Sequence, residues 1–237
     1  MMAFMNGRVL KYGIFTLIML ITGMIPMAGF GVQRPNPCVI LLDPAHGGAD
    51  TGVLTDKLRE KDLTLNIALL LRDEGKKIPD FQFRLIRSAD RSLSIAERIA
   101  IAGTAKADCI LSIHVNSGFG KKATGYEVYF PGFQQPATSE DQPTILRDMA
   151  RNKTLNDSVR LAQKMQAGLE AVFPRKGRGL RDAPHPLLES VNIPGVVVEI
   201  AFATHPDDRK KMTEPETQKA VARALLRGLQ DYFRKMP

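Results

Sequence analysis

Apolar residues follow two different periods along this chain, and the two periods alternate. Continuous or alternating apolar runs predict strands at 38–43, 81–87, 109–114, 126–130 and 196–200. Between these runs, apolar residues recur every three or four positions and predict helices at 63–71, 95–105, 155–172 and 215–233. Strands that alternate with helices predict an α/β fold, in which a single domain has a mostly parallel twisted sheet flanked by helices on both faces.

One segment, 131–156, interrupts this alternation. It is polar and rich in Pro, Gln, Thr and Asp, so we interpret it as an insertion that contains a short helix at Thr144–Arg151.

The first 31 residues differ from the rest of the chain. Arg8 and Lys11 precede an uncharged stretch, Tyr12–Gln33, whose centre is dense in Ile, Leu, Met and Phe. A positive segment followed by an apolar one is typical of an export signal, and an uncleaved membrane anchor is the alternative because the run is long enough to span a bilayer. Pro26 and the nearby glycines favour cleavage. We expect a signal peptide or N-terminal anchor at 1–31, a domain at 32–237, and export of the protein.

Composition excludes several other classes of protein. The chain has 237 residues, a net charge of +8 and 24% charged residues, so it is neither a disordered tail nor a polytopic membrane protein. Two cysteines, Cys38 and Cys109, are too few for a disulfide scaffold, and both are expected to be core thiols, although a bridge between them is conceivable if their strands are neighbours. The absence of Trp and the small aromatic share argue against nucleic acid as a partner.

Three polar residues stand where an α/β sheet places its ligands, at the carboxyl ends of the strands, and a fourth stands at the start of the first helix. His46 follows the first predicted strand, His114 ends the third, Glu199 lies in the apolar run 196–202, and Glu60 begins the first helix. Zinc in hydrolases takes three ligands from His and carboxylate and leaves a fourth position open, and a further carboxylate then moves the proton. These residues are therefore a candidate metal centre with a base, for which Glu199 is the best candidate.

Each of these residues also has an ordinary interpretation. His46 before two glycines suits a turn, and His114 suits a hydrogen-bonded core histidine. Glu60 suits the start of a helix, where its charge complements the helix dipole. Glu199 could be ion-paired with an arginine such as Arg87. Spacing alone does not decide between these interpretations.

Several motifs, in order along the chain, closely resemble the zinc-dependent N-acetylmuramoyl-L-alanine amidases of bacteria. The first motif reads Asp43-Pro44-Ala45-His46-Gly47-Gly48, and a later one reads Ser112-Ile113-His114-Val115-Asn116. The similar segments are 42–52, 60–62, 87–98, 107–116, 125–129, 178–181 and 194–202. Three departures from the family pattern are Ala45 and Ala201, which replace glycines, and His185, which replaces an apolar or aromatic residue. For His185, packing or solvent exposure is favoured over contact with substrate.

The resemblance implies one Zn²⁺ held by His46, Glu60 and His114, with Glu199 as general base and acid. The implied reaction cleaves the amide between N-acetylmuramic acid and L-alanine in peptidoglycan. The enzyme is expected to act as a monomer in the periplasm or cell wall. Asn116, Arg178 and Arg181 are the expected substrate-binding residues, because a cationic rim attracts stem-peptide carboxylates or anionic wall polymers.

Two rival functions and one form of control accompany this resemblance. The rivals are a zinc peptidase or carboxypeptidase, and a non-catalytic wall-binding protein. In one branch of the family an inserted helix covers the zinc site until an activator protein withdraws it. The composition of segment 131–156 permits such an activator to act here, without demanding it.

Overall fold

The computed structural model describes residues 36–55, 58–118, 120–132 and 142–234. The predicted signal segment 1–31 lies outside these residues. The strands are β1 (Cys38–Pro44), β2 (Leu54–Thr55), β3 (Leu58–Arg59), β4 (Phe81–Leu85), β5 (Cys109–Asn116), β6 (Tyr126–Phe130), β7 (Gly177–Asp182) and β8 (Gly195–Phe202). The helices are α2 (Glu60–Gly75), α3 (Ile95–Thr104), α4 (Gln142–Leu169), α5 (Pro186–Glu189), α6 (Pro206–Met212) and α7 (Pro215–Arg234).

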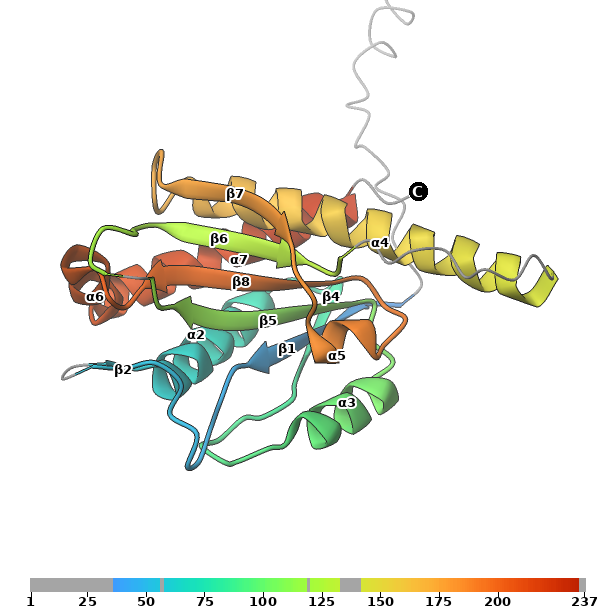
Figure 1. Ribbon diagram of the computed structural model, residues 1–237, viewed down its shortest axis with the longest axis horizontal. Coiled ribbons are helices and arrows are strands. Elements are labelled where there is room, and N and C mark those ends of the chain that lie inside the picture. Colours follow the sequence, from blue (N-terminus) through green and yellow to red (C-terminus); the bar gives the residue numbers. More distant parts are fainter. Residues whose placement is uncertain (1–35, 56–57, 119, 133–141, 235–237) are drawn as a thin grey trace, which may run out of the picture. The chain divides into compact units, whose positions relative to one another are not determined.

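Six strands of the described residues form one sheet in the order β4-β1-β5-β8-β6-β7 (Figure 1). Strands β4, β1, β5 and β8 pair in parallel, β6 runs antiparallel to β8, and β7 runs parallel to β6. The predicted α/β fold with a mostly parallel sheet is therefore confirmed.

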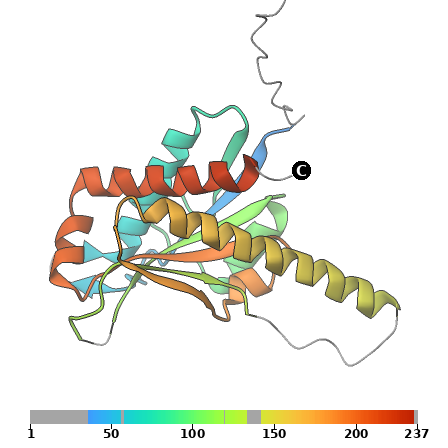
Figure 2. The same cartoon turned by 90° about the horizontal axis from the view of Figure 1, so that it is seen from above.

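Helices cover the two faces of this sheet unequally. Helices α2, α4 and α7 bury the larger apolar cluster against one face, where α7 packs on both α2 and α4 (Figure 2). The short helices α3 and α5 cover part of the other face over a smaller cluster. Because side chains alternate along a strand, His114, Glu127 and Glu199, which are in register on β5, β6 and β8, point to this second, thinly covered face.

Helix α4 corrects the prediction for the middle of the chain. The short helix predicted at Thr144–Arg151 and the helix predicted at 155–172 are one helix of 28 residues. The first half of α4 extends beyond the ends of the strands, and Ile145, Leu146 and Met149 are exposed on it (Figures 1 and 2). A polar run, 151–154, separates the apolar residues of this half from those that pack on the sheet, which explains why the pattern predicted two helices instead of one. Residues 133–141, the remainder of the predicted insertion, lie outside the described residues.

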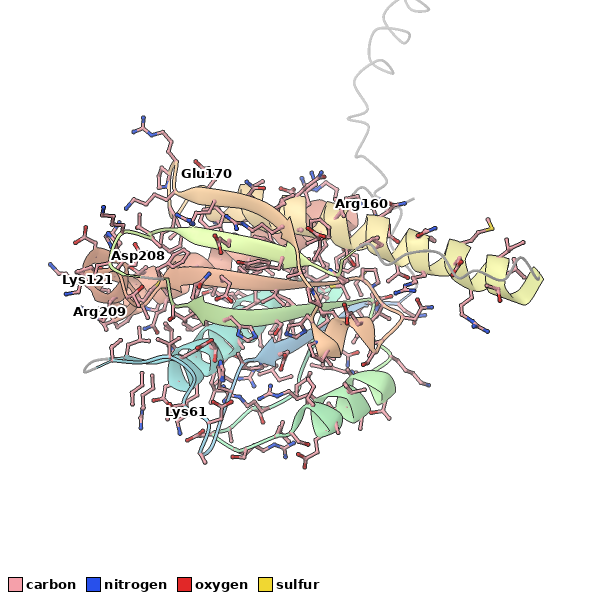
Figure 3. The ribbon with its side chains drawn as sticks, viewed as in Figure 1. Lys61, Lys121, Arg160, Glu170, Asp208 and Arg209 are labelled. Atoms are coloured by element: carbon pink, nitrogen blue, oxygen red, sulfur yellow. The ribbon has the colours of Figure 1, made fainter. Side chains whose placement is uncertain are left out.

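Buried Asp208 joins α6 to the start of β6. Its carboxylate accepts hydrogen bonds from the Thr124 hydroxyl at 2.7 Å and from the backbone N–H groups of Gly125 and Phe202 at 2.8 and 3.1 Å. Figure 3 shows Asp208 at the end of the sheet where β8 leads into α6. This carboxylate therefore fixes the beginning of β6 against the end of β8.

The two cysteines are buried thiols in β1 and β5, as predicted for core residues. Within the described part of the chain, no helix is both long and apolar enough to cross a membrane.

Candidate metal centre

Three of the predicted residues converge on one point at the carboxyl ends of β1 and β5. The Nε2 atom of His46 lies 3.2 Å from Oε1 of Glu60, and the Nδ1 atom of His114 lies 3.3 Å from the same oxygen. One ligand atom from each residue lies within 4.8 Å of the other two. The structure thus brings together the His, Glu and His that the sequence singled out.

Glu60 is held in place by the backbone on both sides. It is 2% exposed, and its two oxygens accept hydrogen bonds from the backbone N–H groups of Val53 and Val115, each at 2.9 Å. Burial alone would raise the pKa of Glu60, but the hydrogen bonds from His114, His46 and these amides lower it to about 2. The carboxylate is therefore ionised and fixed in orientation, as a metal ligand must be.

His46 sits in a left-handed backbone conformation, with φ of 60°, on a loop held by cationic side chains. Arg98 donates to the His46 carbonyl at 2.6 Å, and buried Arg87 donates to the Ala45 carbonyl at 2.8 Å. Lys61 donates to the Gly48 carbonyl at 2.7 Å, and Figure 3 shows this lysine near the start of α2. These hydrogen bonds from the cationic side chains to the loop carbonyls compensate for the backbone strain at His46 and fix the direction of its side chain.

A second carboxylate orients the His46 ring. Asp50 Oδ2 lies 2.8 Å from Nδ1 of His46, which leaves Nε2 to face Glu60. The hydrogen bond with Glu60, opposed by burial and aided by Asp50, raises the pKa of His46 to about 9. These surroundings favour a positive charge at the centre of the cluster, which is what a bound cation supplies. The donor set and the carboxylate behind the imidazole both fit a metal ion.

Glu199 lies beside this cluster in the sheet. It pairs in register with His114 on the neighbouring strand, so the two side chains point to the same face. Its Oε2 atom is buried and has no hydrogen-bond partner among the described residues. Burial, followed by the repulsion from Glu60 and Glu127, raises the pKa of Glu199 to about 7, although His114 opposes the rise.

The alternative that Arg87 pairs with Glu199 is wrong. Arg87 instead donates to the carbonyls of Pro44, Ala45 and Lys61, at 2.9, 2.8 and 2.7 Å. An orphaned buried carboxylate atom beside a cation-favouring cluster therefore needs another explanation, and a proton-transferring role provides one.

A pocket of about 190 Å³ opens at Glu199 and His114. Its described lining comes from β5, β6, β8, α5 and the segment that leads into α5, and none of it from α4. His185 forms part of the wall, with its ring centroid 6.1 Å from that of His114, and its buried Nδ1 has no partner among the described residues. The structure thus places His185 in the pocket, where it packs against His114.

The three residues expected to bind substrate meet at a residue that the sequence analysis missed. Asn116, Arg178 and Arg181 all contact the carboxylate of Glu127 on β6. Tyr129, which lines the pocket, also donates to Glu127. The signal was available, because Glu127 is a charged residue within an apolar strand, which is the same feature that pointed to Glu199.

An α/β sheet with a His/Glu/His cluster and an adjacent carboxylate at the strand ends has the architecture of a metal-dependent hydrolase. Comparison with known proteins makes this class specific. The model of the family described as N-acetylmuramoyl-L-alanine amidase matches residues 40–231. The chain belongs to the N-acetylmuramoyl-L-alanine amidase family.

Curated relatives agree with this assignment. The amidase LytC of Bacillus subtilis is 30% identical over 205 residues, which are 85% of this chain and 37% of LytC. The amidase AmiC of Escherichia coli is 27% identical over an alignment of 239 positions, which covers 88% of this chain and 57% of AmiC. The chain therefore spans only about two to three fifths of the length of these two relatives.

Solved structures show the same fold. An N-acetylmuramoyl-L-alanine amidase of Clostridium difficile 630 superposes with a TM-score of 0.70 and 29% identity, over 85% of this chain and all of that one. The CwlD amidase of Clostridioides difficile, solved in complex with the GerS lipoprotein, superposes with a TM-score of 0.69 and 26% identity, over 83% of this chain and 98% of that one. The predicted family and fold are both confirmed.

Proposed function

We propose that the protein is a Zn²⁺-dependent N-acetylmuramoyl-L-alanine amidase, which cleaves the amide between N-acetylmuramic acid and L-alanine in peptidoglycan. One observation carries this proposal: the convergence of His46, Glu60 and His114 beside a buried, unpartnered Glu199. Membership of the amidase family supports the choice of bond, and the named relatives LytC and AmiC are amidases of the same kind.

His46, Glu60 and His114 would hold the ion. Two neutral imidazoles and one carboxylate carry a single negative charge, so the bound Zn²⁺ would keep a net positive charge. A zinc ion in such a site polarises a carbonyl and lowers the pKa of bound water towards neutrality. The remaining task, proton transfer, falls to Glu199. Its raised pKa of about 7 suits a group that first accepts a proton from water and then delivers it to the leaving amine.

Export and partners form part of the same proposal. Residues 1–31 would direct the chain out of the cytoplasm as a cleaved signal or an anchor, and residues 32–237 would act as a monomeric catalytic domain in the periplasm or cell wall. A protein partner that acts on segment 131–156 would contact the exposed apolar residues of α4. The GerS complex of CwlD shows that a relative of this chain is held by another protein.

Digestion of purified peptidoglycan tests the reaction. The zinc-loaded protein is expected to create new L-alanine amino termini, and Glu199→Gln should lower that rate by about 10²- to 10⁴-fold while zinc content, measured by mass spectrometry, stays near one ion per chain. Glu189→Gln is the matched control, because it removes the same charge from an exposed position on α5.

Two results would contradict the proposal. Release of D-alanine or diamino-acid fragments, without new L-alanine amino termini, would indicate a peptidase. Unchanged activity in Glu199→Gln, or no zinc in the purified protein, would remove Glu199 or the metal from the mechanism.

A further inference from the structure

Glu127 gathers an unusual number of donors for a single carboxylate. It is 4% exposed, and its Oε1 lies 2.9 Å from Nε of Arg178 and 3.4 Å from a terminal nitrogen of Arg181. Its Oε2 accepts hydrogen bonds from the Asn116 amide at 2.9 Å and from the Tyr129 hydroxyl at 2.5 Å. Four donors on one carboxylate hold its neighbours in a single arrangement.

This carboxylate belongs to the same row of the sheet as the metal centre. Glu127 pairs with Glu199 across β6 and β8, and Glu199 pairs with His114 across β8 and β5. Residues in register on neighbouring strands share one face, so these three side chains stand side by side. The two arginines on β7 extend the row by one more strand, away from His114.

A bulge in β7 makes the arginine pair possible. In a regular strand, Arg178 and Arg181 would point to opposite faces, because they are three residues apart. Between the pairs made by Tyr126 and Val128, however, β7 contains one more residue than β6, and Gly179 in this bulge has φ of 95°. The extra residue restores a common direction, so both guanidinium groups reach Glu127.

The pair carries more positive charge than Glu127 neutralises. Two guanidinium groups face one carboxylate, and their side chains are 41% and 50% exposed. Arg178 also lies over the ring of Phe202, with 5.3 Å between the guanidinium carbon and the ring centroid. Its only hydrogen bond within the described residues uses Nε, so its two terminal amino groups remain available to an anion.

We propose that Arg178 and Arg181 form a subsite for a free carboxylate on the peptide side of the substrate, with Glu127 as the positioning residue. This rests on the proposed function. Strands lie about 4.8 Å apart, so β7 stands roughly 10 Å from Glu199. An extended peptide covers about 3.5 Å per residue. The carboxylate recognised here therefore belongs to one of the first three residues after the scissile amide.

Two matched soluble substrates test the subsite. Both are N-acetylmuramoyl tripeptides of one sequence, in which the peptide carboxylates are either all free or all converted to carboxamides. The wild-type protein is expected to show a KM about tenfold lower for the free acid, with similar kcat, because a charge-assisted pair is lost in the carboxamide.

Variants then assign the preference to the arginines. Arg181→Gln should reduce the KM ratio between the two substrates to near one, chiefly by raising KM for the free acid. Glu127→Gln should reduce the ratio in part, because the arginines lose their common anchor. Lys210→Gln, which removes one positive charge from an exposed position on α6, should preserve the ratio. Equal KM values in the wild type, or an undiminished ratio in Arg181→Gln, would overturn the subsite.

Binding separates the subsite from the reaction. Calorimetric titration of the same tripeptides into Glu199→Gln measures recognition without turnover. A tenfold preference in binding for the free acid, lost when Arg181→Gln is added, would support the subsite even if the wild type cleaved neither compound. Failure of the wild type to cleave either compound would refute the proposed function instead. Cleavage of both compounds with no preference in binding or KM would leave the amidase in place and refute the subsite.

Discussion

Gly52 offers the sharpest perturbation of the metal centre. Its φ is 60°, a conformation that favours glycine, and it lies directly against two of the proposed ligands. A Cβ added here would stand 2.5 Å from Cδ2 of His46 and 2.6 Å from Oε2 of Glu60. Both distances are far below van der Waals contact, so Gly52→Ala must displace at least one ligand.

The cost of this substitution has two separable parts. An alanine in the left-handed region costs about 1–2 kcal/mol of folding free energy. Displacement of a ligand is expected to weaken the metal site by about 10- to 100-fold, which is the loss that disturbed ligand orientation typically produces.

Gly120→Ala isolates the first part. Gly120 has φ of 74°, and a Cβ there would meet no described atom within 4 Å. Both variants should lose stability in urea denaturation of the metal-free proteins, and Gly52→Ala should lose more because its Cβ also displaces a side chain, but only Gly52→Ala should bind zinc more weakly in competition with a chelator. Wild-type zinc affinity in Gly52→Ala would refute the assignment of His46 and Glu60 as ligands.

Three further outcomes follow from the buried groups near the site. Asp43→Ala leaves Arg98 without the carboxylate that it contacts at 2.5 Å, so the free energy of unfolding should fall by about 3–5 kcal/mol in urea denaturation, and a loss below about 1 kcal/mol would contradict this. His185→Leu removes a buried nitrogen without a partner among the described residues, so unfolding free energy should rise by about 1 kcal/mol in the same assay, and a decrease would show that Nδ1 is satisfied in solution. Because only ionised Glu199 accepts a proton, kcat/KM should fall about tenfold per pH unit below its pKa of about 7, and a flat profile of initial rates on the acid side would exclude Glu199 as the base.

Local patterns predicted most of the secondary structure. The buried strands β1, β5 and β8 and the helices α2, α3 and α7 all lie where apolar periodicity predicted them. The sequence pattern did not predict β7, which the bulge at Gly179 and the exposure of its arginines make unlike a regular strand. Helix α4 was predicted as two helices because the polar run 151–154 separates the apolar residues of its projecting half from those of its packed half.

The sequence by itself determined the class of chemistry. Ordered motifs around His46, Glu60, His114 and Glu199 identified the family, because residue type and spacing are local properties that a single sequence displays. The convergence of His46, Glu60 and His114 within 4.8 Å supports the ligand roles that the resemblance implied.

Only the tertiary structure decided which residues surround that chemistry. Glu127 and Arg181 are far apart in the chain, and their contact depends on strand order, register and a one-residue bulge. The orphaned Oε2 of Glu199 likewise results from packing between segments that are far apart in the chain. Such relations depend on which strands pair across the sheet, and a period of two residues identifies a strand without identifying its partner.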